Sequence, residues 1–199
     1  MELCSLGSGS RGNGTLVRSA GACVLVDCGF TLKQLERRLG EAELAPEDLD
    51  AVLVTHEHSD HASGIGALKR RTGLAVHATA GTWRGMKRAP GAGDGVLAGD
   101  RPLSIGDLGI HPVTVPHDAR EPVQFRFSAR GLSLGVLTDL GHPSAHVVER
   151  FGRLKSVLGP GINFIVPFLD RVAHKVSILE RQLPNASQDA ITADNVLVQ

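Results

Sequence analysis

The sequence predicts an α/β layered domain. Short apolar segments typical of strands recur from Met1 to about His142, and amphipathic helical patterns separate several of them. The chain has 199 residues, of which 42% are hydrophobic, so it can form one medium domain with a core, or one domain and a short appendage. Alternating strands and helices of this kind indicate helices packed in layers on sheets.

The predicted elements begin with two strands joined by a polar turn around residues 8–14. A buried strand follows at 22–29 (ACVLVDCG), and then an amphipathic helix at 31–44, for which Thr31 is placed as the N-cap. Residues 45–50 form a polar connection, and 51–55 (AVLVT) form a second short apolar strand. This strand ends directly before a cluster of histidines and carboxylates.

The next predicted elements are a helix at 62–71 and a strand at 74–80. The Gly/Ala/Pro-rich residues 88–102 indicate a loop that divides two halves of the domain. Further strands are expected at 109–117, 121–131 and 132–141. Beyond about Glu149 the composition changes, because residues 151–199 carry three of the six Phe residues and a separate Gly-Pro-Gly turn, so we expect a boundary there.

Charge and cysteine content narrow the function classes. The net charge is zero and the pI is about 7.1, so the whole chain offers no electrostatic case for binding a polyanion. The basic run 69–71 lies at a predicted helix end and is interpreted as a solvated face that offsets the helix dipole.

The start of the chain has no secretory pattern, and the three cysteines lack C-x-x-C spacing, which indicates a reduced, cytoplasmic protein. These three cysteines are interpreted as small hydrophobic residues: Cys4, Cys23 and Cys28. No apolar run reaches the roughly 18 residues needed for a transmembrane segment.

The six residues 56–61 (HEHSDH) carry the main chemical signal. His56 and His58 are two apart in an extended segment, so both imidazoles point to the same side and can share one metal ion. Asp60 and His61 offer an oxygen and a nitrogen to a second divalent ion. Without a cation, so many polar side chains together would be costly to bury. Glu57 alternates away from its neighbours and is not expected to be a ligand.

Further ligands are expected at strand ends elsewhere. His117 (in TVPHDA) and Asp139 (in LTDLGH) are candidates, and Asp139 could bridge both ions. Asp27 either orients a ligand histidine from behind or serves as a turn or helix-capping carboxylate, and the sequence leaves both readings open. His142, three residues after Asp139, either protonates a leaving group or contacts substrate, or has no role in the site.

The Gly/Ser-rich loop between the first two predicted strands could line such a site. Four of its residues are candidates for substrate binding, although a simple hairpin turn explains them equally well: Ser8, Ser10, Arg11 and Asn13. His77 and His111 lie in strand-like runs and are interpreted as structural histidines.

Together these motifs resemble the metallo-β-lactamase superfamily of dinuclear hydrolases over about residues 1–148. Within it, SLGSGSRGNGT, HEHSDH and TDLGH resemble the YycJ/WalJ branch, whose members are linked to processing of DNA ends as phosphodiesterases. The resemblance implies an αββα sandwich and two divalent ions, with Zn²⁺ favoured over Mn²⁺ or Fe²⁺. It implies His56, His58 and His117 on one ion, and Asp60, His61 and Asp139 on the other. A metal-bridged hydroxide would attack, and Asp60 would orient that water.

The chain departs from this pattern toward its C-terminus. In the superfamily, a later strand supplies a further histidine to the second metal ion. The YycJ-like branch also has an Asn-His-Asp element soon after the TDLGH segment. Neither feature is recognisable here. His174 shares a strand face with apolar residues and is interpreted as a core histidine. Instead, residues 149–199 resemble the start of a stomatin/prohibitin (SPFH, band 7) domain, through GPGINFIVPFLDRV and ITADNV. We therefore expect a chimera joined near Val148 to Phe151, with a metal-binding domain at 1–148 and a partial SPFH-like segment at 149–199.

Three functions remain open at this point. The first is a metal-dependent phosphodiesterase acting on DNA or RNA, as the branch resemblance implies. The second is a hydrolase of a small ester, thioester or lactam, which the same metal pair could attack. The third is a catalytically impaired metal-binding fusion that self-associates through residues 149–199.

Overall fold

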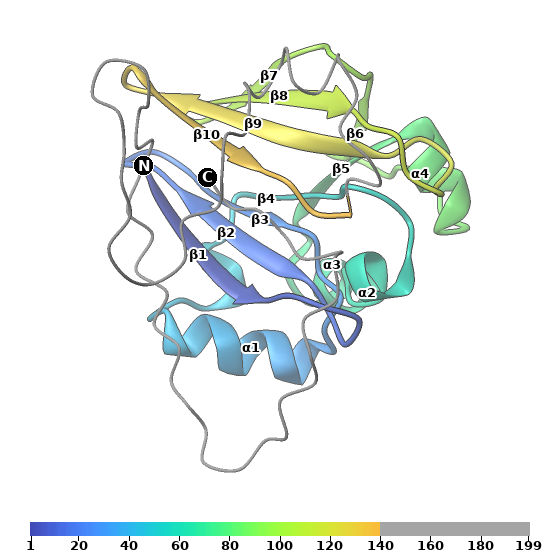
Figure 1. Ribbon diagram of the computed structural model, residues 1–199. Coiled ribbons are helices and arrows are strands. Elements are labelled where there is room, and N and C mark those ends of the chain that lie inside the picture. The colour runs from blue at the N-terminus through green and yellow to red at the C-terminus, as the bar shows by residue number, and fades with distance from the viewer. Residues whose placement is uncertain (140–199) are drawn as a thin grey trace, which may run out of the picture.

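A computed structural model of the chain describes residues 1–139. In this part of the chain the strands form two sheets that pack face to face, and helices cover the outer face of the first sheet (Figure 1). These are the two sheets and one helical layer of the expected αββα sandwich. The helical layer expected over the second sheet is not formed by residues 1–139.

The first sheet has six strands in their chain order. They are β1 (Glu2–Gly7), β2 (Gly14–Arg18), β3 (Cys23–Val26), β4 (Ala51–Leu53), β5 (Ala75–Thr79) and β6 (Gly95–Leu97). The first three strands pair antiparallel, and β3 to β6 pair parallel. The carboxyl ends of the parallel strands therefore meet at one edge, where open α/β sheets bind ligands.

The second sheet is an antiparallel meander. Its strands are β7 (Leu103–Ile105), β8 (Leu108–Thr114), β9 (Val123–Ala129) and β10 (Leu132–Val136), in the order β10-β9-β8-β7. The helices are α1 (Leu32–Glu41), the 3₁₀ turn η1 (Pro46–Asp48), α2 (Ser59–Ala62), α3 (Ile65–Thr72) and α4 (Ala80–Gly85). No helix among residues 1–139 is both long enough and apolar enough to cross a membrane.

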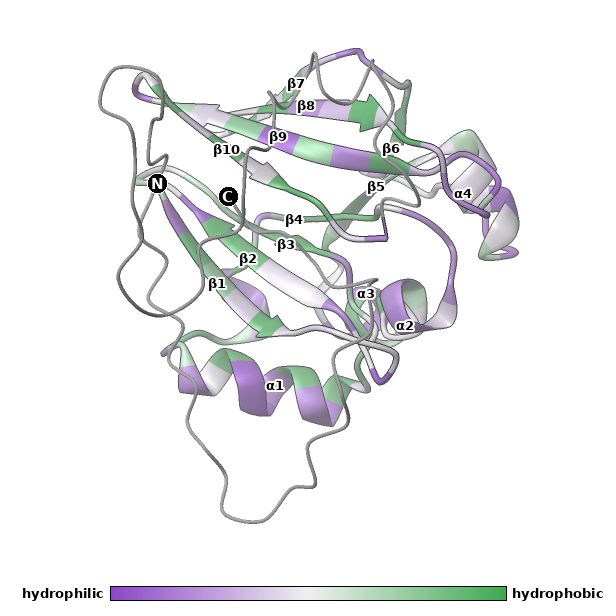
Figure 2. Cartoon of the chain, viewed as in Figure 1, coloured by the Kyte–Doolittle hydropathy of each residue, from purple (hydrophilic) through white to green (hydrophobic). Residues whose placement is uncertain are grey.

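Two apolar cores hold these layers together, because β-strand side chains alternate between the faces of a sheet. Between the sheets, Val24 and Val26 of β3 belong to the same buried cluster as Phe125 and Phe127 of β9. On the outer face, Leu35 and other apolar residues of α1, α3 and α4 pack on the strands. Hydrophobic residues accordingly alternate with hydrophilic ones along α1 (Figure 2).

Most predicted elements are confirmed, with shorter bounds. Thr31 caps α1 as expected, and its side chain forms a capping box with Gln34. The predicted helix 62–71 is wrong in its start, because the helical segment begins at Ser59 and breaks before Ile65. At this break the Gly64 N–H donates to the Cys28 carbonyl, and a Cβ at Gly64 would lie 2.1 Å from the Phe30 carbonyl oxygen.

The prediction of a continuous loop at 88–102 is also wrong in part. Residues 95–97 form β6, which pairs with β5 and becomes the last strand of the first sheet. The short helix α4 and the short strand β7 were not anticipated either. These elements are only three to six residues long, so they carry too little periodicity to be recognised in the sequence. Residues 98–102 do connect the two sheets, as expected for a dividing segment.

Candidate metal centre

The predicted ligands meet at the edge where the parallel strands end. Asp27 follows β3 and His56 follows β4, and these strands are parallel neighbours. Asp60 and His61 lie in α2, directly after the histidine pair. From the second sheet, His117 follows β8 and Asp139 follows β10. Four segments that are distant in the sequence therefore converge on one place.

Two groups of side chains there have the composition and spacing of metal ligands. The first consists of His56, His58, His117 and Asp139, and the second of Asp60, His61 and Asp139. Within each group one ligand atom per residue lies within 4.8 Å of the others. Asp139 belongs to both groups, which is the arrangement expected for a carboxylate that bridges two ions.

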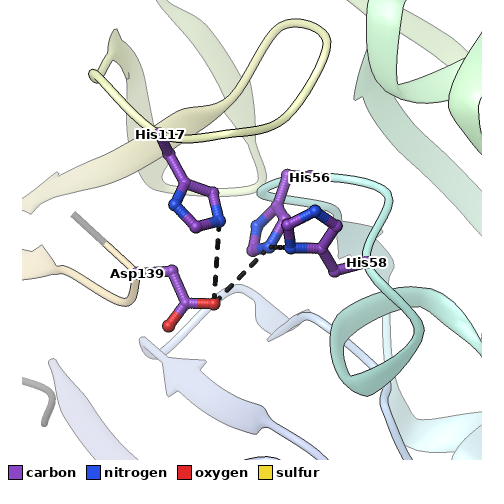
Figure 3. Close-up of side chains that lie close together, drawn as sticks. All are labelled: His56, His58, His117 and Asp139. Carbon is purple, nitrogen blue, oxygen red and sulfur yellow. Dashed lines mark hydrogen bonds and ion pairs between the residues drawn. The ribbon is translucent and has the colours of Figure 1, made fainter. Parts of the chain in front are cut away.

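The first group is tightly converged (Figure 3). The His56 Nε2 lies 3.1 Å from the His58 Nδ1, and the ring centres of His56 and His117 are 4.6 Å apart. Asp139 Oδ2 lies 3.5 Å from His56 Nε2 and 3.9 Å from His117 Nε2. The nitrogen atoms of three imidazoles thus face one carboxylate oxygen.

Asp27 supports the second group through its contact with His61. Its Oδ2 lies 2.8 Å from His61 Nδ1 and accepts from the Thr55 hydroxyl at 2.7 Å, while its Oδ1 accepts from the Thr55 N–H at 2.8 Å. Asp27 is buried and has a φ of 61°, so its carboxylate turns inward from a left-handed backbone position. Of the two readings left open by the sequence, these contacts match the one in which Asp27 orients a histidine.

Thr55 completes this support, and sequence reasoning missed it. Its Oγ1 lies 2.9 Å from His56 Nδ1 as well as contacting Asp27. One hydroxyl therefore connects the two ligand groups through the ring nitrogens that face away from the metal side. The only signal in the sequence was a hydrogen-bonding side chain at the end of strand 51–55, next to the histidines.

The buried histidines have strongly shifted pKa values. Burial, reinforced by the neighbouring His61, lowers the pKa of His56 to about 3. Burial would also lower the pKa of His61, but the charges and hydrogen bonds of Asp27 and Asp139 outweigh it and raise this pKa to about 10. The hydrogen bond from His61 lowers the pKa of Asp139 to about 2, although burial acts in the opposite direction. Burial therefore dominates the pKa of His56, whereas the carboxylates of Asp27 and Asp139 dominate the pKa of His61.

The β1–β2 loop reaches the second ligand group through Asn13. The Asn13 Nδ2 lies 3.0 Å from His61 Nε2 and 3.2 Å from Asp60 Oδ2, and its Oδ1 accepts from the Gly9 N–H at 2.9 Å. Asn13, a candidate for substrate binding, is buried, and its amide contacts these ligands and the loop, so its role toward substrate stays a prediction. The other three candidates of this loop are exposed and not in either ligand group: Ser8, Ser10 and Arg11.

The donor set fits divalent ions. The His117 Nε2 is buried and has no hydrogen-bond partner among the described residues, although it points at the Asp139 carboxylate (Figure 3). A buried imidazole nitrogen without a partner is costly, and a metal ion would satisfy it. Histidine nitrogens and carboxylate oxygens are also the ligands that zinc and similar divalent ions accept.

The remaining predicted residues lie elsewhere. Glu57 turns away from both ligand groups, and its Oε1 accepts from the Arg120 N–H at 2.9 Å. His77 is in β5 and His111 in β8, outside both groups. His142 lies outside the described residues, so its predicted role stays a prediction.

The curated relatives that this chain resembles include bacterial exonucleases. It is 37% identical over 153 residues to exodeoxyribonuclease WalJ of Streptococcus pneumoniae serotype 2, covering 72% of this chain and 57% of that protein. It is 36% identical over 143 residues to exodeoxyribonuclease YycJ of Bacillus anthracis, covering 70% and 54%. The chain thus spans a little over half the length of these relatives.

The C-terminal part has different relatives. Residues 144–199 match the family model of the SPFH domain / Band 7 family. A stretch of 55 residues is 44% identical to human stomatin-like protein 2, mitochondrial, covering 28% of this chain and 15% of that protein. The change of resemblance near residue 150 fits the predicted junction.

The fold of residues 1–139 recurs in solved structures. The subclass B3 metallo-beta-lactamase MEM-A1 from a soil metagenome library has a TM-score of 0.55 at 22% identity, covering 67% of this chain and 58% of that chain. The FEZ-1 metallo-beta-lactamase from Legionella gormanii has a TM-score of 0.56 at 14% identity, covering 68% and 59%. The family model of the metallo-beta-lactamase superfamily matches residues 7–158, and this chain therefore belongs to that superfamily.

Proposed function

We propose that this chain is a metal-dependent phosphodiesterase that hydrolyses DNA from an end. The observation that carries the proposal is the pair of ligand groups that share Asp139. Two divalent ions held by these groups would lower the pKa of a bound water and stabilise the charge of a phosphodiester. The names of the two exodeoxyribonuclease relatives favour DNA as the substrate.

The chain's own residues would divide the work as follows. His56, His58 and His117 would hold one ion, and Asp60 and His61 the other, with Asp139 common to both. Asp60, which is part-exposed in the site, would also orient the attacking water. The Asp27 and Thr55 contacts keep the ligand rings in place, which in metal sites sustains affinity and activity.

Zn²⁺ is the ion we favour, with Mn²⁺ or Fe²⁺ as alternatives. Three of the four residues in the first group are histidines, which suit zinc. The second group has two carboxylates and one histidine, and its harder oxygen ligands are also compatible with manganese or iron.

Metal content and hydrolysis test this proposal together. Elemental analysis of the purified 199-residue chain should find two ions per chain, and a chelator should abolish degradation of end-labelled DNA. Asp139→Ala should lose both metal and activity, because it removes the shared ligand. Asp107→Asn, at the turn between β7 and β8, is the control and should retain both. Thioester and β-lactam substrates serve as comparisons, and hydrolysis of these but not of DNA would contradict the proposal.

We also propose the division of the chain into a metal-binding domain at 1–148 and an SPFH-like segment at 149–199 that mediates self-association. The second segment lies outside the described residues, so the support is the family match to residues 144–199. Light scattering of the full chain and of a version ending at residue 148 would test it, and an equal oligomeric state would contradict the self-association.

A further inference from the structure

A basic region directly follows the ligand cluster in the sequence. Residues 61–93 contain six Lys/Arg residues and no Asp/Glu, whereas residues 1–60 contain five Lys/Arg and ten Asp/Glu. The zero net charge of the chain therefore hides an uneven distribution. The six cations are Lys69, Arg70, Arg71, Arg84, Lys87 and Arg88. They lie in α3, in α4 and in residues 86–88 directly after α4, and we call these three segments together the basic face.

Only part of this charge is neutralised within the described residues. Lys69 pairs with Asp94, and Arg71 pairs with Glu47. Arg84, Lys87 and Arg88 are exposed, and no carboxylate among residues 1–139 lies within ion-pair distance of them. Exposed cations that form no ion pair contribute positive potential, which attracts phosphates.

Arg88, just after α4, contacts α3. The Arg88 guanidinium packs on α3, since a Cβ at Gly66 would lie 2.0 Å from Arg88 Nη2. Arg88 and Lys69 also line the same hollow, together with Trp83. Arg88, which follows α4, therefore lies beside the α3 residues Gly66 and Lys69, in a hollow that Asp94 also lines.

The α4 helix also lies against the segments that carry the metal ligands. A Cβ at Gly85 would lie 2.3 Å from the Cγ of Glu57, the residue between His56 and His58. One turn earlier, the Gly81 N–H donates to Glu121 Oε2 at 2.6 Å. Glu121 belongs to the connection between His117 and β9, and Figure 1 shows α4 beside this connection.

We propose that Arg84, Lys87 and Arg88 bind the phosphate backbone of a DNA strand whose end occupies the candidate metal centre. Exposed Lys and Arg side chains contact phosphates without reading the base sequence, which suits an enzyme that removes successive nucleotides. The inference rests on the proposed function, because the metal centre supplies the reason for a strand to lie here. It assigns a role to a local cluster of cations that the zero net charge of the whole chain does not reveal.

The experiment separates strand binding from hydrolysis. Binding of a fluorescein-labelled single-stranded oligonucleotide is measured by anisotropy in the presence of a chelator, at a series of salt concentrations. The triple variant Arg84→Glu/Lys87→Glu/Arg88→Glu is compared with the wild-type chain and with Lys33→Glu/Arg37→Glu. The control changes two exposed cations of α1, outside the basic face. Hydrolysis of bis(p-nitrophenyl) phosphate by the metal-loaded proteins is measured in parallel, because this small diester cannot span the basic face.

The triple variant should bind the oligonucleotide at least about tenfold more weakly. Its affinity should also depend less steeply on salt, because each lost phosphate contact reduces the slope of log affinity against log salt concentration by roughly one unit. The α1 variant should bind like the wild type, and all three proteins should hydrolyse the small diester equally. Equal DNA affinity of the triple variant and wild type would overturn the inference, even if the wild type degrades DNA. Conversely, binding through the basic face without metal-dependent hydrolysis would refute the proposed function and leave the binding surface intact.

Discussion

The Asp27 carboxylate offers the most informative test of how the ligand groups are positioned. Asp27→Asn keeps the shape of the side chain, and asparagine tolerates the left-handed backbone found at this residue. The new amide can still accept from the Thr55 N–H and donate to the Thr55 hydroxyl. What it loses is the negative charge and the acceptor oxygen 2.8 Å from His61 Nδ1.

The expected cost follows from that single contact. A hydrogen bond to a charged group contributes about 1.5–3 kcal/mol, so Asp27→Asn should lower the free energy of unfolding by about that amount. Loss of a carboxylate that supports a ligand histidine reduces metal affinity by about 10- to 100-fold. The weakened ion should be the one held by Asp60 and His61, because Asp27 supports His61.

Asp94→Asn is the matched control. Asp94 is also a buried carboxylate with three hydrogen bonds: its Oδ1 accepts from Lys69 and from the Val76 N–H, and its Oδ2 from the Gly91 N–H. It lies outside both ligand groups. Chemical denaturation should therefore show similar destabilisation of the two variants, and metal titration should show weaker binding only for Asp27→Asn. Unchanged metal affinity in Asp27→Asn, or equal loss in the control, would refute the reasoning.

Three further predictions follow from contacts around the same site. Asn13→Ala should weaken binding of the second ion while sparing the first, because Asn13 Nδ2 donates to the carboxylate and to the carbonyl of Asp60. Metal titration with a chromogenic chelator would resolve the two affinities. Gly29→Ala should destabilise the chain by more than about 3 kcal/mol or prevent folding, because the added Cβ would lie 1.7 Å from the Asp60 carbonyl oxygen. The melting temperature of the variant measures this loss, and a melting temperature equal to that of the wild type would contradict the prediction. The Cys28 thiol should resist alkylation at pH 8 until the protein is unfolded, because burial raises its pKa to about 11; mass spectrometry of peptides after iodoacetamide treatment would detect early modification.

The sequence predicted those structural features that depend on residues close together in the chain. The α1 helix and its Thr31 cap could be predicted because amphipathic periodicity and capping depend on neighbouring residues. The ligand pattern at 56–61 could be recognised because a strand end and a helix start place neighbouring side chains on one site. The short elements α4 and β6 could not, because tertiary packing rather than periodicity stabilises them.

The sequence by itself determined the kind of chemistry, since His56, His58, Asp60 and His61 lie within six residues and set the metal-binding character. Tertiary structure decided which distant groups join them. The approach of Asp139 to both ligand groups depends on two sheets meeting at one edge, which no local pattern encodes. The same holds for the Asp27–Thr55 support and for the basic face beside the site, because both arise from packing between segments that are far apart along the chain.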